Sequence, residues 1–238
     1  MSAIDCLLID LDDTIYPEAE YFRVIFDEFC NQLKLDRENV HSFMVDFAYH
    51  RRNSPDIFGV FLRSIGLWSE SNRDCLFNLY KTVTMELLPY PGVNDLMRTC
   101  TENEIRVVVL TNGIAAAQEN KWRNLNIDEK LSFCFQATRL LGQDKPSAET
   151  FEKVRSQLGF GWEHILTIGD SYEKDIAYPT SRGALGILVG NSENLPKDSG
   201  AIHVGVIADA IPLIKMAIVS RADQKVVIKP MNDGSALT

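Results

Sequence analysis

Short runs of apolar residues recur along the chain, and each run ends in glycine or a polar residue. The clearest runs lie at residues 6–9, 107–110, 165–168 and 187–189, and weaker ones at 133–136 and 202–206. Each run is too short for a buried helix, and unbroken apolar runs of this length are typical of parallel strands covered on both faces. The pattern therefore predicts a buried parallel sheet.

Segments with apolar residues at helical spacing separate these predicted strands. They lie at residues 93–103, 115–125, 148–158, 174–182 and 208–220. Alternation of strands and helices is typical of βα units, so the sequence predicts an α/β fold.

One long segment, residues 17–87, interrupts this alternation. Its pattern is helical and rich in aromatic residues. It predicts about four helices forming a small domain inserted after the first strand, with residues 1–16 and 88–238 as a discontinuous core. We interpret the aromatic residues mainly as the apolar core of that domain, and Arg51 and Arg52 as part of a solvated charged face.

Composition and charge restrict the class of partner. The chain has 238 residues, 45% of them hydrophobic, and a formal net charge of −9, which argues against a general nucleic-acid binder and a polybasic membrane anchor. Five scattered cysteines without a CxxC pair are typical of reduced thiols. No signal peptide or membrane-length apolar stretch is evident. We expect a cytoplasmic monomer or homodimer. The polar tail after Arg221 is interpreted as a weak strand or a loosely held end, and its sequence does not indicate what it does.

Polar residues follow the predicted strands at the points where these end. Asp10 and Asp12 follow the first strand, Thr111 and Asn112 the second, and Asp170 a third. Because the carboxyl ends of parallel strands meet at one edge of a sheet, we expect these side chains to lie close together.

A metal site is predicted at the same edge. Asp175 lies one helical turn beyond Asp170, where it would join Asp10 and Asp12. Clustered carboxylates repel one another unless a cation compensates, and their hard oxygen atoms suit Mg²⁺. The sequence therefore predicts a magnesium site formed by these four residues.

The spacing also suggests a division of roles. Asp10 would attack phosphorus as a nucleophile, and Asp12 would protonate the leaving alcohol and then deprotonate the attacking water. Thr111 would offer its hydroxyl and Asn112 its backbone amide to the phosphoryl oxygens, while Lys145 would supply a fixed positive charge.

Four motifs, taken together, resemble the haloacid dehalogenase (HAD) superfamily in order and spacing. They are Asp10-Leu-Asp12-Asp-Thr14, Leu110-Thr111-Asn-Gly113, Lys145-Pro146 and Gly169-Asp170-Ser-Tyr-Glu-Lys-Asp175. The resemblance implies a three-layer Rossmann-like core with a helical cap domain. It also implies Asp10 as nucleophile, Asp12 as acid/base, Asp170 and Asp175 as metal ligands, and the backbone carbonyl of Asp12 as a further ligand.

The resemblance also favours one chemistry within the superfamily. Dehalogenase members lack an acid at the position of Asp12, because a halide leaves without a proton, so this chain resembles the phosphatase branch. Tyr16 and Pro17 resemble the part of that branch that includes nucleotidases acting on nucleoside monophosphates. Pro179 departs from the small residues usual in relatives and affects the helix that follows Asp175.

The leading hypothesis is thus a Mg²⁺-dependent phosphatase acting on a small phosphorylated metabolite through an aspartyl-phosphate intermediate. The alternatives are a phosphoryl mutase or phosphonate hydrolase on the same core, and a catalytically silent binding module.

Overall fold

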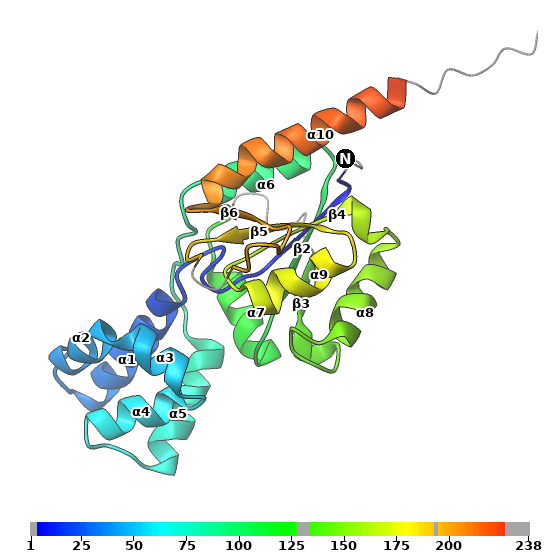
Figure 1. Ribbon diagram of the computed structural model, residues 1–238. Helices are drawn as coiled ribbons and strands as arrows, with labels where there is room; N and C mark the ends of the chain where they lie inside the picture. Colours follow the sequence, from blue (N-terminus) through cyan, green and yellow to red (C-terminus); the bar gives the residue numbers. More distant parts are fainter. Residues whose placement is uncertain (1–3, 128–133, 193–194, 227–238) are drawn as a thin grey trace, which may run out of the picture.

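A computed structural model describes residues 4–127, 134–192 and 195–226 of the chain (Figure 1). Its centre is a six-stranded parallel sheet with the order β3-β2-β1-β4-β5-β6. The strands are β1 (Cys6–Ile9), β2 (Arg106–Thr111), β3 (Cys134–Ala137), β4 (Ile165–Gly169), β5 (Leu185–Val189) and β6 (Ile202–Val204). Each overlaps a strand expected from the apolar runs, so the predicted α/β fold with a parallel sheet is confirmed.

Helices cover both faces of the sheet (Figure 1). On one face lie α6 (Val93–Glu102), α7 (Ala115–Asn124) and α10 (Ala210–Val226), whose apolar residues belong to one cluster, and on the other lie α8 (Ala148–Leu158) and α9 (Ala177–Ser181). Residues 221–226, which the sequence suggested as tail, continue α10, and residues 227–238 lie outside the described residues.

Side chains of the central strand alternate between the two helical layers. Leu7 and Ile9 belong to the larger apolar cluster, and Cys6 and Leu8 to a second cluster on the α8 side. Successive side chains of a strand point to opposite faces, so an unbroken apolar run is what a strand between two layers requires.

Five helices follow β1 and lie together beside the sheet (Figure 1). These inserted helices are α1 (Glu18–Leu33), α2 (Glu38–Val45), α3 (Phe47–Asn53), α4 (Ile57–Ser64) and α5 (Glu70–Thr82). The sequence predicted about four. The additional boundary is a single non-helical residue, Asp46, between α2 and α3, and no proline or glycine marks it.

Aromatic side chains form the centre of the inserted helices. The rings of Phe26 and Phe61 stack with centroids 4.1 Å apart, and Phe22 stacks on Tyr80 at 5.5 Å. All four residues are buried, so the interpretation of these aromatics as core is correct.

The two chain segments that join the inserted helices to the sheet are held together. The backbone N–H of Tyr90, in the returning segment, donates to the carbonyl of Ile15, in the leaving segment, at 2.8 Å. The N–H of Leu87 donates to the carbonyl of Asn124 at 2.9 Å, which ties the returning segment to the end of α7. The insertion is therefore closed at its base.

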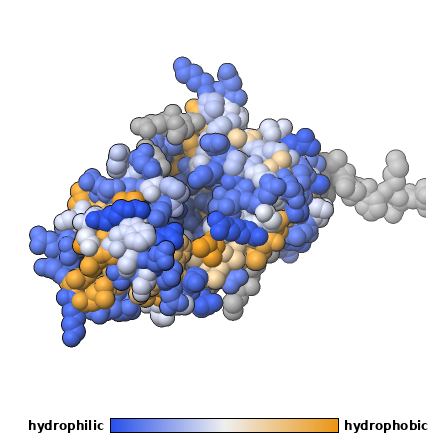
Figure 2. Space-filling model, turned by 90° about the horizontal axis from the view of Figure 1, so that it is seen from below, coloured by the Kyte–Doolittle hydropathy of each residue, from blue (hydrophilic) through white to orange (hydrophobic). Residues whose placement is uncertain are grey.

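The face seen in Figure 2 is mostly hydrophilic, with apolar residues in separate groups. Within the described ranges, every helix is too short or too polar to cross a bilayer.

Candidate active site

A cavity of about 500 Å³ opens at the carboxyl ends of the central strands. Every residue that the sequence assigned to catalysis, substrate binding or metal binding lines it: Asp10, Asp12, Thr111, Asn112, Lys145, Asp170 and Asp175. The inserted helices contribute the opposite wall with Glu18, Ala19, Phe47, Ala48 and Arg51.

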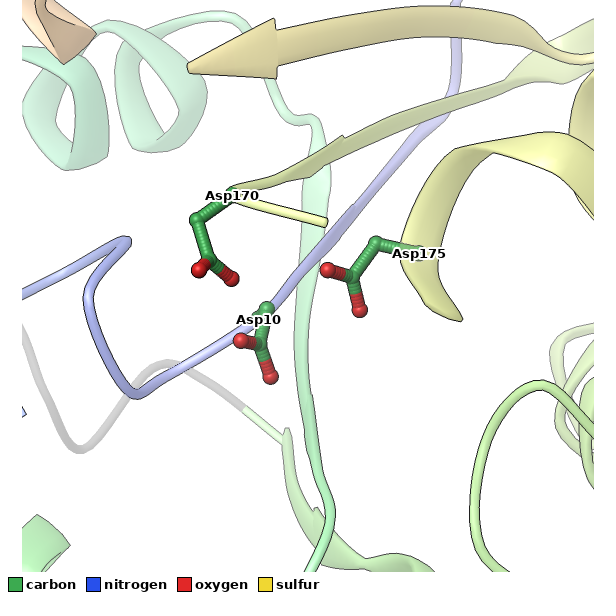
Figure 3. Close-up of side chains that lie close together, drawn as sticks. All are labelled: Asp10, Asp170 and Asp175. Carbon is green, nitrogen blue, oxygen red and sulfur yellow. The ribbon is translucent and has the colours of Figure 1, made fainter. Parts of the chain in front are cut away.

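Three carboxylates converge in this cavity (Figure 3). Asp10 follows β1, Asp170 follows β4, and Asp175 lies in the turn after Asp170. One carboxylate oxygen from each lies within 4.8 Å of the others. This spacing would let all three oxygens contact a single cation.

Lys145 is the cation that the chain itself places among these acids. Its Nζ lies 2.7 Å from Oδ1 of Asp10, 2.6 Å from Oδ1 of Asp175 and 2.7 Å from the carbonyl oxygen of Leu110. Burial acts to lower the pKa of Lys145, but Asp10 and Asp175 outweigh it, so the pKa is raised above its usual value.

One lysine does not compensate the negative charge of the cluster. Burial raises the pKa of Asp10 well above its usual value, with Lys145 opposing and Asp175 and Asp170 adding to the rise. Burial and the charge of Asp175 raise the pKa of Asp170 to about 7. The cluster therefore carries more negative charge than Lys145 neutralises, and an additional cation would stabilise it.

The side chain of Asn112 holds the backbone of Lys145. Its Nδ2 donates to the carbonyl of Lys145 at 2.9 Å, and its Oδ1 accepts from the N–H of Lys145 at 2.8 Å. Asn112 thus fixes the position of the lysine with its side chain, a role that the sequence did not suggest.

A π-helical turn, Tyr172–Ile176, carries Asp175. Pro179 explains part of this geometry, because proline has no N–H to donate to the carbonyl four residues earlier. The carbonyl of Asp175 instead accepts from the hydroxyl of Thr167 on β4 at 2.9 Å. The departure at Pro179 therefore leaves Asp175 in the cluster and ties its backbone to the sheet.

Gly169 leaves the space that the side chain of Asp175 occupies. A Cβ at this position would clash with Cβ, Cγ and Oδ2 of Asp175. Gly169→Ala is expected to displace this carboxylate from Lys145 and lower kcat about 100-fold, the typical cost of misplacing a catalytic group by about 1 Å. Steady-state kinetics would measure the loss. Gly205→Ala is the matched control, because a Cβ there meets no atom within 4 Å; a Gly169→Ala enzyme as active as this control would contradict the prediction.

Asp12 lies in the same cavity but its carboxylate faces another set of partners. Oδ1 accepts from the hydroxyl of Tyr16 at 2.6 Å, Oδ2 accepts from Nε2 of Gln118 at 2.8 Å, and Nζ of Lys121 donates to both oxygens at 2.9 and 2.8 Å. Burial acts to raise the pKa of Asp12, but the charge of Lys121 and these hydrogen bonds outweigh it, so the pKa lies below its usual value.

Lys121 joins Asp12 to the inserted helices. The lysine side chain is fully buried, and its Nζ also lies 3.2 Å from Oε1 of Glu18 in α1. Glu18 in turn accepts from Nε of Arg51 at 3.0 Å and from Nη2 at 3.2 Å. Arg51 therefore lines the cavity and is ion-paired with Glu18, while its side chain remains 43% exposed, in line with a solvated position. The sequence did not predict the ion pair.

Three of these residues, Glu18, Gln118 and Lys121, were not predicted from the sequence. A signal for two of them exists in α7, whose buried residues are Ala117, Gln118, Asn120 and Lys121. A helix that buries mostly polar side chains must satisfy them with specific partners, so such a helix directly after a catalytic motif indicates polar contacts at the site.

Asp13 has a local role at the turn before α1. Its φ is +55°, and its Oδ1 accepts from the N–H of Glu18 at 2.9 Å, at the first residue of α1. Burial raises its pKa to about 6.

A model of the haloacid dehalogenase-like hydrolase family matches residues 4–178 of the chain. The protein belongs to this family. The resemblance seen in the four motifs is therefore confirmed, and so is the assignment of this HAD hydrolase as an enzyme.

Known relatives of this HAD hydrolase include phosphatases. A glyceraldehyde 3-phosphate phosphatase from Methanopyrus kandleri is 24% identical over 183 residues, which cover 73% of this chain and 78% of that protein. With the family match, such curated relatives support the predicted class of phosphoric monoester hydrolase.

Solved structures show the same fold. YfnB from Bacillus subtilis, bound to magnesium, has a TM-score of 0.69 at 18% identity and covers 90% of this chain and 99% of its own. CbbY from Rhodobacter sphaeroides, in complex with phosphate, has a TM-score of 0.59 at 19% identity and covers 87% and 96%.

Proposed function

We propose that this HAD hydrolase is a Mg²⁺-dependent phosphomonoesterase in which Asp10 forms an aspartyl-phosphate intermediate. The observation that carries the proposal is the position of Asp10, 2.7 Å from the Lys145 ammonium and within a cluster of three carboxylates at the cavity. A carboxylate fixed beside a buried cation, with a second carboxylic acid two residues later, is the arrangement that nucleophilic phosphoryl transfer requires.

The residues of the cluster fit a magnesium ion. Asp10, Asp170 and Asp175 offer hard oxygen atoms, which Mg²⁺ prefers. Burial, together with repulsion from the neighbouring carboxylates, raises the pKa values of Asp10 and Asp170 despite the charge of Lys145. When bound, the ion would neutralise charge on the phosphoryl group. The side chain of Asp12 points to other partners, so its contribution as a ligand would come from its backbone carbonyl.

The first half of the reaction transfers the phosphoryl group to Asp10. A carboxylate oxygen of Asp10 forms a bond to phosphorus while the bond from phosphorus to the leaving oxygen breaks. Asp12, once it has taken up a proton, gives that proton to the leaving oxygen, which departs as an alcohol. Lys145 holds the nucleophile in position and offsets negative charge near the phosphoryl group.

The second half hydrolyses the intermediate. Asp12, now a carboxylate, takes a proton from water as the water oxygen attacks phosphorus. The bond between phosphorus and Asp10 breaks, which returns both aspartates to their initial states and releases phosphate. The Thr111 hydroxyl and the backbone amide of Asn112 would bind the phosphoryl oxygens throughout.

The substrate in this proposal is a small phosphorylated metabolite. We propose that residues 17–87 form a cap domain, whose side chains in the cavity wall select the leaving group. The cavity volume of about 500 Å³ lies in the range of small-molecule sites. Triose phosphates, the substrate class in the names of curated relatives, and nucleoside monophosphates are the first two classes to test.

Phosphate release from a panel of phosphorylated metabolites tests the proposal. With Mg²⁺ present we expect turnover of at least one triose phosphate, sugar phosphate or nucleoside monophosphate, and EDTA is expected to lower it at least about 100-fold, because the clustered carboxylates would then lack their counter-ion. Addition of Mg²⁺ in excess over EDTA should restore the rate.

The alternatives give different results in the same assay. An isomerised product without free phosphate would indicate a phosphoryl mutase. Release that is unchanged by EDTA would contradict the metal assignment, and absence of turnover together with absence of Mg²⁺ binding by calorimetry would favour a binding module.

A further inference from the structure

The carboxylate of Asp12 has no position left for a substrate in this structure. A carboxylate offers about four lone-pair positions, and four donor contacts occupy them: the Tyr16 hydroxyl, the Gln118 amide and two from the Lys121 ammonium. For Asp12 to contact a leaving oxygen, at least one of these donors must move away.

Lys121 is the donor best suited to move. It makes two of the four contacts, and it already has a second carboxylate partner, Glu18, whose Oε1 is 3.2 Å from Nζ. A shift of the ammonium from Asp12 toward Glu18 therefore keeps the buried ammonium paired with a carboxylate. Asp12, whose side chain is 21% exposed, keeps the hydrogen bonds from Tyr16 and Gln118.

The surroundings of Lys121 favour such a shift. Nζ lies 5.5 Å from the ring centroid of Tyr21, 5.9 Å from that of Phe22 and 5.3 Å from that of Tyr80. Aromatic faces attract a cation without fixing its direction, so the ammonium can move between the two carboxylates while it stays beside these rings.

The two carboxylates that compete for Lys121 belong to different parts of the molecule, because Asp12 follows a strand of the sheet and Glu18 lies in the inserted helices. Lys121 belongs to α7, whereas Glu18, which is 5% exposed, begins α1. The position of α1 therefore sets how strongly Glu18 competes with Asp12 for the ammonium. Arg51 takes part as well, because it binds both oxygens of Glu18 and so opposes the shift of Lys121.

We propose that Lys121 is a positioning residue that holds Asp12 in a resting orientation. When the side chain of Lys121 moves so that its ammonium contacts Glu18 alone, the carboxyl group of Asp12 is free to turn toward the leaving oxygen. The inserted helices thereby control the acid/base step as well as substrate choice. The inference rests on the proposed phosphatase function and adds Glu18, Lys121 and Arg51 to it.

Two substrates with different leaving groups distinguish an effect of Lys121 on proton transfer by Asp12 from an effect on substrate binding. p-Nitrophenyl phosphate loses a phenolate that needs no proton, whereas the alcohol of benzyl phosphate must be protonated as it leaves. Because kcat/KM covers the steps up to loss of the leaving group, the ratio of the two kcat/KM values isolates the contribution of Asp12.

Glu18→Gln keeps the shape of the side chain but removes the charge that accepts Lys121. It is expected to lower kcat/KM for benzyl phosphate at least about tenfold relative to p-nitrophenyl phosphate, within the range of one acid–base contribution. Glu20→Gln, at an exposed position of the same helix, is the matched control and should leave the ratio unchanged. An equal loss with both substrates, or no loss with either, would overturn the inference.

Arg51→Met provides the opposite test and applies even where Glu18→Gln fails to fold. Without Arg51, Glu18 has Lys121 as its remaining cationic partner, so kcat/KM for benzyl phosphate should rise relative to kcat/KM for p-nitrophenyl phosphate. An unchanged ratio of the two values, or a fall, would count against the proposed movement of Lys121. Turnover of p-nitrophenyl phosphate by the unsubstituted enzyme tests the underlying phosphatase function separately, since its absence would remove the proposed function itself.

Discussion

Phosphate release is expected to fall by about four orders of magnitude or more in Asp10→Asn, the typical result of removing a catalytic nucleophile. An amide oxygen is a far weaker nucleophile than a carboxylate, and asparagine occupies the same volume. The variant should therefore fold, with an unfolding temperature close to that of the unsubstituted protein. Initial rates with the best substrate of the panel measure the effect, and the covalent phosphoenzyme should be absent from acid-quenched samples.

Asp13→Asn is the matched comparison, because it makes the same chemical change in the same cavity. The Oδ1 of Asp13 accepts from the backbone N–H of Glu18, and an amide oxygen can accept that bond as well. Its loss of activity should remain below about tenfold, in line with the modest effect of exchanging one capping residue for another. Comparable losses in the two variants would contradict the assignment of Asp10 as the nucleophile.

Lys145→Met is expected to reduce both activity and stability. The substitution removes the cation that contacts Asp10 and Asp175, whose side chains are 11% and 3% exposed. Breaking a buried ion pair in this way typically costs about 3 kcal/mol or more in the free energy of unfolding, and loss of a fixed charge beside the reacting group costs about 100-fold in kcat. Urea unfolding and steady-state kinetics measure the two effects.

A surface lysine of a nearby helix separates this effect from a general loss of charge. Lys153 pairs with Glu149 in α8, with side chains that are 46% and 54% exposed. Lys153→Met should change neither quantity appreciably, because exposed pairs contribute about 0–1 kcal/mol. A Lys145→Met protein as stable and active as Lys153→Met would show that Lys145 does not organise the cluster.

The sheet and the acidic cluster could be predicted because each depends on a local pattern and one general rule. Apolar runs mark strands, and residues directly after parallel strands meet at one edge. Asp10, Thr111 and Asp170 all follow this rule, so their proximity needed no knowledge of tertiary contacts. Lys145 and Asp175 were found because they lie in motifs with fixed spacing to these strands.

The partners of Asp12 could not be predicted in this way. Lys121 is 109 residues from Asp12 and 103 from Glu18 in the sequence, and nothing in the local pattern of α7 gives the direction of its side chain. Only packing of α7 against the inserted helices brings the three together. The number of inserted helices was also missed for a physical reason, since a single change in backbone conformation at Asp46 ends one helix and begins the next without any residue type that breaks helices.

The base of the insertion has a consequence for how this protein can diversify. The hydrogen bond from the N–H of Tyr90 to the carbonyl of Ile15 joins the two chain segments where the insertion begins and ends. The strands of the sheet therefore pair with one another as they would if a short surface loop replaced the insertion. Changes of length or sequence within the insertion then alter one wall of the cavity without shifting the register of β1, which pairs with β2 and β4. Mutations in the insertion can thus change the shape of the cavity almost independently of the carboxylates. The exceptions are Glu18 and its partner Arg51, both within the insertion, where a mutation would affect the cavity wall and, through Lys121, Asp12.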